Sequence, residues 1–243
     1  MFNRPDGLYF IGETMSDHLP TLASLGRLRR DAPKTIAGFR RWRSIIDSDG
    51  AVPAKVKRLF VACAATVKGY GELAARELAA AQAAGLTEAE AGAAIAILAS
   101  VRGEGASLRF HTLFREIYSG AADPDWPDDD MIVEEGAAEA NFLQYFGTMP
   151  PSLAKLLEVK PLGADAYYLM REGTLSGTAL GPIYAELLLV TVLVADYSSW
   201  ASVHMKGART AGASEEAVAE AVICAVPTAG LSAWVIGATA MDA

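Results

Sequence analysis

The sequence predicts an all-α protein built from two tandem copies of one helical unit. Of its 243 residues, 52% are hydrophobic but only 8% are aromatic, and the apolar set is rich in alanine and leucine. Such a composition is typical of helices packed on helices. No segment of convincing length alternates apolar and polar residues as a half-buried strand would. Segments of the first half also recur in the second half, which indicates a duplication.

Each half of the chain opens with two segments of helical character. Pro20-Thr-Leu-Ala-Ser-Leu25 recurs as Pro151-Ser-Leu-Ala-Lys-Leu156, and a longer amphipathic segment follows each of them, at 34–46 and at 163–175. An amphipathic segment of this length is typical of a helix with one buried face. We therefore predict a helix at each longer segment and interpret the recurrence as the first sign of an internal repeat.

The long helices that follow are expected to begin near a proline and to end at a glycine. Small residues precede Pro53 and Pro182. Proline suits the first turn of a helix because its missing N–H has no helical partner there. At an offset of 127 residues, Gly85 in the first half falls on Gly212 in the second. Glycine ends helices because it readily adopts the left-handed conformation that a helix end requires.

The next helix of each half is expected to begin at a capping residue. Thr87 is followed by Glu90, which completes a capping box, whereas Ser214 is followed only by an acidic first turn. The second of these helices belongs to a nearly apolar stretch, 221–240, about as long as a membrane span. Because Pro227 and several small residues interrupt the stretch, we predict a helix pair buried in an oligomer instead.

The repeat sets the expected domain organisation. We predict a first helical repeat with a degenerate site at 1–118, a linker at 119–135 and a second repeat with the candidate site at 136–243. The linker contains SGAADPDWPDDD, and this proline and aspartate content is typical of a solvated connection. Its aspartates at 128–130 lack the alternating ligands and the glycine of a calcium loop, so we expect no metal site there.

The acidic balance of the chain argues against negatively charged partners. The formal net charge is -8 and the pI is near 5.0. Nucleic acids and anionic membranes need clustered lysine and arginine. The dense basic patch, Arg27–Arg30 with Arg40, Arg41 and Arg43, has the spacing of the outer faces of two helices. We therefore interpret this patch as solvent-exposed and expect no nucleic-acid or membrane partner.

Cysteine usage and the N-terminus indicate a cytoplasmic protein. Cys63 and Cys224 stand far apart in apolar surroundings, and the chain has no CxxC motif. We therefore expect no disulfide framework and interpret both cysteines as small buried residues. The segment MFNRPDGLYF lacks the charged start and the long apolar run of a signal peptide.

The polar cluster DYSSWASVH, at 196–204, is the expected functional site. Its counterpart at 69–77 reads GYGELAARE and contains no histidine. If the cluster is helical, steps of four and seven residues place Trp200 and Tyr197 on the same side as His204. Imidazole and phenol groups bind or move protons, so we expect acid–base chemistry in the second half only.

One segment in each half resembles the carboxymuconolactone decarboxylase and alkylhydroperoxidase D family. These segments run from PAKVKRL to AAGLTE at 53–88 and from ELLL to HMKGARTAGASEE at 186–216. The resemblance implies an all-α fold of such units, assembled into rings in which helices pack between subunits. Some members carry two copies in one chain and form trimers. We therefore expect a homo-oligomer, with a trimer favoured.

The redox members of that family carry a CxxCxxxH motif whose thiols reduce peroxide. Placing His204 on its histidine puts Tyr197 and Trp200 where the thiols should be. Because the family route needs a thiolate attacker and a resolving thiol, we expect this chain to lack peroxide reduction. The family also places a glutamate upstream of the thiols, and Glu186 lies one residue out of register with it.

The decarboxylase members imply a cofactor-free lyase or isomerase that acts on a small carboxylated or lactone-type molecule. A histidine can protonate an enol at carbon, and hydroxyl groups can hold the enolate oxygen. Trp200 would form an apolar wall. The expected catalytic residues are His204, Tyr197 and Glu186, and the expected substrate-binding residues are Ser198, Ser199 and Trp200.

Two other classes of function stay open from the sequence. The chain could be a binding or scaffold protein whose cleft has lost its chemistry, and a cleft closed by Trp200 and Tyr197 would support that reading. It could also be a thiol enzyme that uses Cys63 or Cys224 by another route. Burial of both thiols would argue against the latter.

Overall fold

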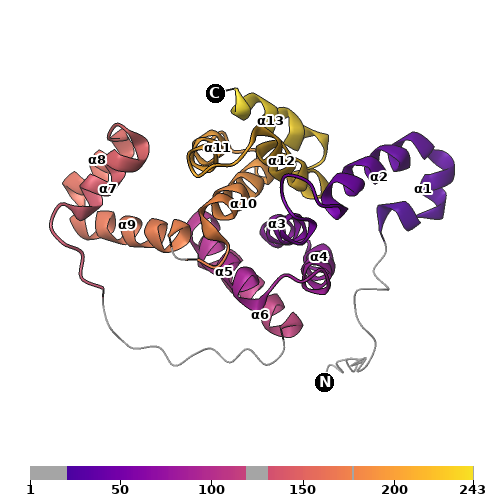
Figure 1. Ribbon diagram of the computed structural model, residues 1–243, viewed down its shortest axis with the longest axis horizontal. Helices are drawn as coiled ribbons and strands as arrows, with labels where there is room; N and C mark the ends of the chain where they lie inside the picture. The colour runs from indigo at the N-terminus through magenta and orange to yellow at the C-terminus, as the bar shows by residue number, and fades with distance from the viewer. Residues whose placement is uncertain (1–20, 119–130, 177, 243) are drawn as a thin grey trace, which may run out of the picture.

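The computed structural model describes residues 21–118, 131–176 and 178–242, and every regular element within these ranges is helical (Figure 1). The predicted all-α class is therefore confirmed. In chain order the elements are η1 (Leu22–Ser24), α1 (Gly26–Asp31), α2 (Pro33–Asp47), α3 (Ala54–Val67), α4 (Gly71–Ala83), α5 (Glu88–Arg102), α6 (Glu104–Ile117), α7 (Ala137–Phe146), α8 (Pro151–Val159), α9 (Pro161–Leu175), α10 (Gly181–Ala195), α11 (Ala201–Thr210), α12 (Glu215–Ala229) and α13 (Leu231–Met241).

Helix α10 lies at the centre of the bundle. Every residue from Ala185 to Ala195 is buried, because this helix packs against α3, α5, α9, α11, α12 and α13. A helix that is apolar on all sides is stable in water only when other elements surround it. The buried carboxylate of Glu186 lies within this otherwise apolar segment. An ionisable group in such a place needs partners, and those partners define the candidate site.

The two halves share an order of helices and a set of packing partners. Helix α3 packs on α4 as α10 packs on α11, and α5 packs on α6 as α12 packs on α13. Helix α2 packs on α3 and α12, and α9 packs correspondingly on α10 and α5. Helices α5 and α12 each contain 15 residues, and their first residues, Glu88 and Glu215, are 127 positions apart (215 − 88).

The predicted helix ends are confirmed where a local signal encodes them. Thr87 and Glu90 form the capping box of α5, and the Ser214 hydroxyl accepts a hydrogen bond from the N–H of Ala217 at 3.1 Å. Gly85 and Gly212 have φ angles of 87° and 104°, in the left-handed region that favours glycine.

The apolar stretch 221–240 is a helix pair, as predicted, because Gly230 separates α12 from α13. Its burial between subunits remains a prediction. Within the described residues, no helix combines the length and the apolar character that crossing a membrane requires.

Helices α7 and α8 stand apart from the central bundle, at the far end of α9 (Figure 1). They form a small core of their own with α9, from Ala138, Phe142, Leu153 and Ala164. The linker predicted at 119–135 falls mostly outside the described residues, since only 131–135 are described, and those carry no helix. The C-terminal end of α7 packs against α9. There Tyr145 of α7 reaches Glu186 of α10, where the candidate site lies.

The basic patch is only partly solvent-exposed. The side chains of Arg27 and Arg30 are 89% and 76% exposed. That of Arg43 is only 15% exposed, and its Nη2 lies 3.0 Å from Oε2 of the buried Glu77. The prediction of an outward-facing patch is therefore wrong for Arg43, because α2 turns this residue toward α4.

Candidate active site

Glu186 and His204 form the centre of the candidate site. Nδ1 of His204, on α11, lies 2.7 Å from Oε2 of Glu186, on α10. The Glu186 side chain is 5% exposed, whereas that of His204 is 22% exposed. A buried carboxylate accepts the Nδ1 proton of a neutral imidazole, which fixes the tautomer and leaves Nε2 to exchange a proton with a bound molecule.

Tyr145 is the second partner of Glu186. Its hydroxyl, at the end of α7, donates a hydrogen bond of 2.9 Å to Oε1 of Glu186. Burial and the adjacent Glu186 carboxylate raise the pKa of Tyr145. The phenol therefore stays protonated and remains a donor. Each carboxylate oxygen thus has its own hydrogen-bond partner, which is what a buried charge requires.

Arg171 supplies the positive charge of the site. Its guanidinium carbon lies 3.8 Å from the ring centroid of Tyr145, and Nη1 donates to the Oδ1 atom of Asn141. The Nε atom of Arg171 is buried and has no hydrogen-bond partner among the described residues. Arginine binds carboxylates through a planar array of N–H donors. This side chain is therefore suited to hold an anionic group of a ligand.

Gly207 lets these groups approach one another. It follows His204 by one helical turn, so both residues face α10. A Cβ atom at position 207 would lie 2.4 Å from Oε1 of Glu186 and 2.9 Å from the Tyr145 hydroxyl, closer than real Cβ contacts allow. The glycine is thus required by the carboxylate and the phenol that meet there.

Two cavities lie on either side of this cluster. One, of about 270 Å³, is lined by His204 and Arg171 and includes Trp200 in its wall. The other, of about 620 Å³, is lined by Glu186 and also by Arg171. Residues from five helices line the first cavity: Ser100, Val101, Tyr145, Phe146, Tyr167, Met170, Arg171, Thr174, Leu175, Leu189, Leu193, Val203 and His204, with Trp200 from the preceding turn. A small molecule in this cavity could contact the imidazole and the guanidinium together.

The expected helical face of Tyr197, Trp200 and His204 is not formed. Helix α10 ends at Ala195, and α11 begins only at Ala201, so a turn separates Tyr197 from the histidine. Tyr197 has a φ of 56°, and its hydroxyl donates to the carbonyl of Ala229 at 2.7 Å. Trp200 does line the cavity beside His204, although 61% of it is exposed. The shared face was expected only if 197–204 were one helix, and the turn before α11 rules out that condition.

Of the two predicted serine donors, Ser198 is bonded in the turn through its hydroxyl and Ser199 through its backbone carbonyl. The Ser198 hydroxyl accepts from the N–H of Trp200 at 3.3 Å, and the Ser199 carbonyl accepts from the Ser202 hydroxyl at 3.1 Å. Neither serine is among the described residues that line the two cavities. The structure thus joins His204 and Glu186, places Trp200 nearby, and adds Tyr145 and Arg171, which the sequence reading missed.

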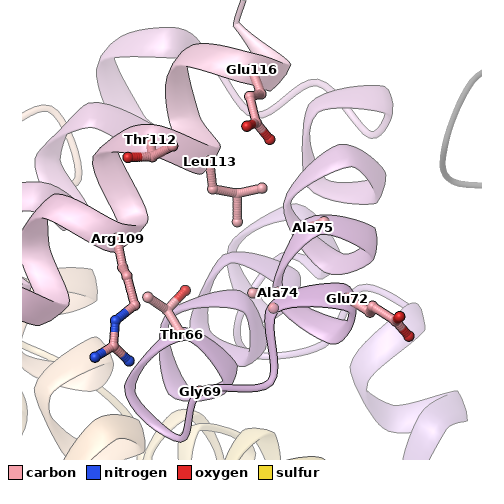
Figure 2. A pocket seen from close by; sticks show the side chains of 10 residues that line it. Thr66, Gly69, Glu72, Ala74, Ala75, Arg109, Thr112, Leu113 and Glu116 are labelled. Carbon is pink, nitrogen blue, oxygen red and sulfur yellow. The ribbon is translucent and has the colours of Figure 1, made fainter. Parts of the chain in front are cut away.

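A further cavity, of about 530 Å³, opens between α6 and the α3–α4 turn (Figure 2). Figure 2 shows Leu113 pointing between the helices, with Arg109 and Glu116 directed to opposite ends of α6. The Thr66 hydroxyl is already bonded to the carbonyl of Ala62 at 2.9 Å. No histidine or cysteine is among the described residues that line this cavity, so it lacks a group suited to proton transfer near neutral pH.

Both cysteines are inaccessible. Cys63 and Cys224 are 0% exposed, and burial raises the pKa of each thiol. The thiolate is the reactive form of cysteine, and burial in apolar surroundings suppresses it. These observations argue against a thiol enzyme that uses either residue.

The comparison with known families finds a match in the second half of the chain. The family model described as the carboxymuconolactone decarboxylase family matches residues 161–243, which are 83 of the 243 residues. The match covers Arg171, Glu186 and His204, but it begins after Tyr145 and so excludes that residue. The predicted family resemblance is thus confirmed for α9 to α13, whereas the duplication remains a prediction. No curated protein matches the chain.

Proposed function

We propose that this protein is a cofactor-free lyase or isomerase that acts on a small carboxylated or lactone-type molecule, with His204 as the proton-transferring group. The observation that carries the proposal is the contact of 2.7 Å between His204 Nδ1 and the buried Glu186 carboxylate, at the wall of a cavity of about 270 Å³. The family match at 161–243 includes both residues and supports the decarboxylase reading.

The geometry suggests how a decarboxylation would proceed. Arg171 holds an anionic oxygen of the substrate beside the imidazole. The bond between the carboxylate and the adjacent carbon breaks, carbon dioxide leaves, and the electron pair passes into an enolate. Nε2 of protonated His204 then donates its proton to that carbon, and the imidazole recovers a proton from water. In an isomerisation, neutral His204 first removes a proton from one carbon to form the enolate and then returns it to another carbon, with no loss of carbon dioxide.

Glu186 supports this step from outside the cavity that His204 lines, and Tyr145 supports it from the cavity wall. The carboxylate stabilises the imidazolium that exists before proton donation, and the phenol keeps the carboxylate in place. Because Tyr197, Ser198 and Ser199 are not among the described residues that line the two cavities, we assign them no role in the proton transfer. The binding-protein alternative remains the competing hypothesis, because a cavity of this size also suits a ligand that is not converted.

Hydrogen exchange at carbon tests the proposal before the substrate is known. The protein is incubated in D₂O with a panel of β-keto acids and lactone carboxylates, and deuterium incorporation and carbon dioxide release are followed by NMR. We expect His204→Gln to lower the rate at least about 100-fold. The control is His111→Gln, on α6, which should retain full activity because His111 is not among the described residues that line the two cavities. Undiminished turnover by His204→Gln would refute the assignment, whereas no turnover of any compound by the wild type would favour the binding protein.

We also propose that the chain contains two diverged copies of one helical unit and assembles as a homo-oligomer, with a trimer favoured. The matching helix order and packing partners of the two halves support the duplication. Large apolar side chains are exposed around α7 to α9, namely Leu143, Val159, Leu162 and Met170, at 43%, 59%, 72% and 51%. Exposed apolar groups gathered on a projecting element favour contact with another subunit. Light scattering coupled to size exclusion measures the mass directly, and a monomer at micromolar concentration would refute the oligomer.

A further inference from the structure

The first half of the chain contains a second cavity surrounded by charge. It lies between α2, α3 and α4 and has a volume of about 890 Å³. Four guanidinium groups and two carboxylates line it, which leaves two positive charges in excess (4 − 2). The charged residues are Arg40, Arg43, Arg58, Arg76, Asp47 and Glu77.

The two carboxylates hold three of the guanidinium groups in place. Asp47 lies 2.6 Å from Arg43 Nη2 and 2.9 Å from Arg58 Nη2. Glu77 lies 3.0 Å from Arg43 Nη2 and 3.0 Å from Arg76 Nη2, and its side chain is 1% exposed. Shared carboxylates of this kind fix the guanidinium groups around the cavity in advance, which lowers the entropic cost of binding an anion.

Arg43 keeps hydrogen-bonding capacity beyond these ion pairs. Its side chain is only 15% exposed, and Nη1 is buried with no hydrogen-bond partner among the described residues. A buried N–H donor without an acceptor is unfavourable, and an anionic oxygen in the cavity would satisfy it. Arg43 lines the same cavity as Arg40 and Arg58, so one ligand could contact all three.

By repeat position, this cavity corresponds to the candidate active site of the second half, but its side chains differ in chemistry. Glu77 is 127 positions before His204 (204 − 77), and Arg58 is 128 positions before Glu186 (186 − 58). Arginine does not release its proton in proteins, and no histidine is among the described residues that line the cavity. The site is therefore suited to binding and not to proton transfer.

Apart from Thr21 and Ser44, the rest of the lining is apolar. Ala54, Ala79, Ala80, Ala83 and Ala84 form a wall of small side chains, and Phe39 contributes a ring. Such a wall accommodates a hydrocarbon chain, whereas the guanidinium groups require negative charge. We propose that this cavity binds a small organic dianion, a dicarboxylate with a short hydrocarbon body, without converting it. This inference does not depend on the proposed reaction.

Calorimetric titration of the full-length protein with succinate, glutarate and adipate tests the inference at low ionic strength. We expect saturable binding of at least one dicarboxylate and a loss of affinity of at least about tenfold in Arg40→Gln/Arg58→Gln, since two charged contacts are removed. Arg41→Gln is the matched control, because Arg41 lies on α2 but does not line the cavity. Circular dichroism confirms that each variant is folded.

Three results would overturn the inference. One is the absence of saturable heat with every dicarboxylate, and another is unchanged affinity in Arg40→Gln/Arg58→Gln. The third is equal binding of inorganic phosphate or hexanoate, since the first lacks a hydrocarbon body and the second lacks a second charge. Titration of His204→Gln separates the two sites, because that variant should lose turnover and bind the dicarboxylate as the wild type does.

Discussion

Glu186 and His204 are 18 positions apart in the chain, yet their side chains meet at 2.7 Å across the interface of α10 and α11. One member of the pair is buried and the other reaches a cavity. A carboxylate in that position accepts a hydrogen bond at Nδ1 and holds the imidazole ring in one orientation. The pair therefore has the arrangement of an acid–base catalyst whose buried member controls the exposed one.

Replacing Glu186 by Gln should separate the charge of this pair from its shape. We expect kcat to fall by about 10² to 10⁴, because the amide can still contact Nδ1 but cannot stabilise the imidazolium. KM should change little, since Glu186 is not among the described residues that line the cavity of His204. Steady-state kinetics on the substrate found by hydrogen exchange measures both parameters. Glu216→Gln, an exposed acid on α12, is the control, and an equal fall in that variant would contradict the assignment.

Replacing Gly207 by Ala should disrupt the same cluster sterically. The added methyl group would lie 2.4 Å from Glu186 Oε1, so the carboxylate must move away from His204 or from Tyr145. We expect kcat to fall at least about tenfold and the protein to lose about 1–3 kcal/mol of stability, as for other overpacked sites. Kinetics and urea denaturation measure the two effects.

Gly173→Ala on α9 is the matched control for that substitution. Position 173 is helical and exposed, and a Cβ atom there would meet nothing within 4 Å. Alanine should therefore raise the free energy of unfolding by about 0.4–1 kcal/mol and leave kcat unchanged. If Gly207→Ala behaved like Gly173→Ala, the close contact of Gly207 with Glu186 would be disproved.

The sequence predicts the fold well because helix ends are encoded locally. Thr87 and Glu90 cap α5 through their own side chains, and Gly85 provides the left-handed residue after α4. The turn at 196–200 escaped prediction because its sequence, DYSSW, contains neither a glycine nor a proline. Tyr197 occupies a left-handed conformation there, which is uncommon for a residue other than glycine.

The candidate site is less predictable because its members meet through tertiary packing. Tyr145 lies on α7, outside the segments that carry the family resemblance, and only the fold brings it to Glu186. Glu186 lies one residue out of register with the glutamate of the family, yet its carboxylate still contacts His204, because the turn after α10 sets the position of His204. One local signal was available in the sequence. Gly207 lies inside a helix, one turn after His204, and a glycine within a helix often marks a close approach of another group.

A buried ion pair between the two halves should carry much of the stability. Lys57 Nζ on α3 lies 3.1 Å from Glu220 Oε2 on α12, and the two side chains are 1% and 9% exposed. Among the described residues, Lys57→Met leaves the carboxylate of Glu220 with the hydrogen bond from the N–H of Val52, at 2.8 Å. We expect a loss of about 3–5 kcal/mol, because an unpaired buried charge remains. Urea denaturation measures this loss.

The double variant Lys57→Met/Glu220→Gln tests whether charge is the cause. Removing both charges should restore part of the stability, since the amide oxygen can still accept from Val52 while no unpaired carboxylate is buried. A double variant that is less stable than Lys57→Met would show that packing at position 57, and not the charge of Glu220, determines the effect.

Glu90 should make the cap of α5 sensitive to acid. Burial by itself would raise the pKa of Glu90, but hydrogen bonds from Lys55 and Thr87 outweigh it, and the pKa is lowered. Oε1 lies 2.8 Å from Lys55 Nζ, and Oε2 accepts from the N–H of Thr87 at 2.7 Å. Because the folded pKa lies below the unfolded value of about 4.3, the stabilisation is complete above that value and is lost as the pH falls through the folded pKa.

Glu90→Gln should therefore cost about 0.5–2 kcal/mol at pH 7, the usual range for a helix cap, and progressively less in acid. Urea denaturation of the wild type and the variant from pH 7 to pH 3 measures the difference. The control, Glu135→Gln, replaces an exposed acid outside any helix and should cost nothing at either pH. A difference between Glu90→Gln and wild type that stays constant down to pH 3 would show that the Glu90 carboxylate charge does not stabilise the cap, because only a charge effect disappears on protonation.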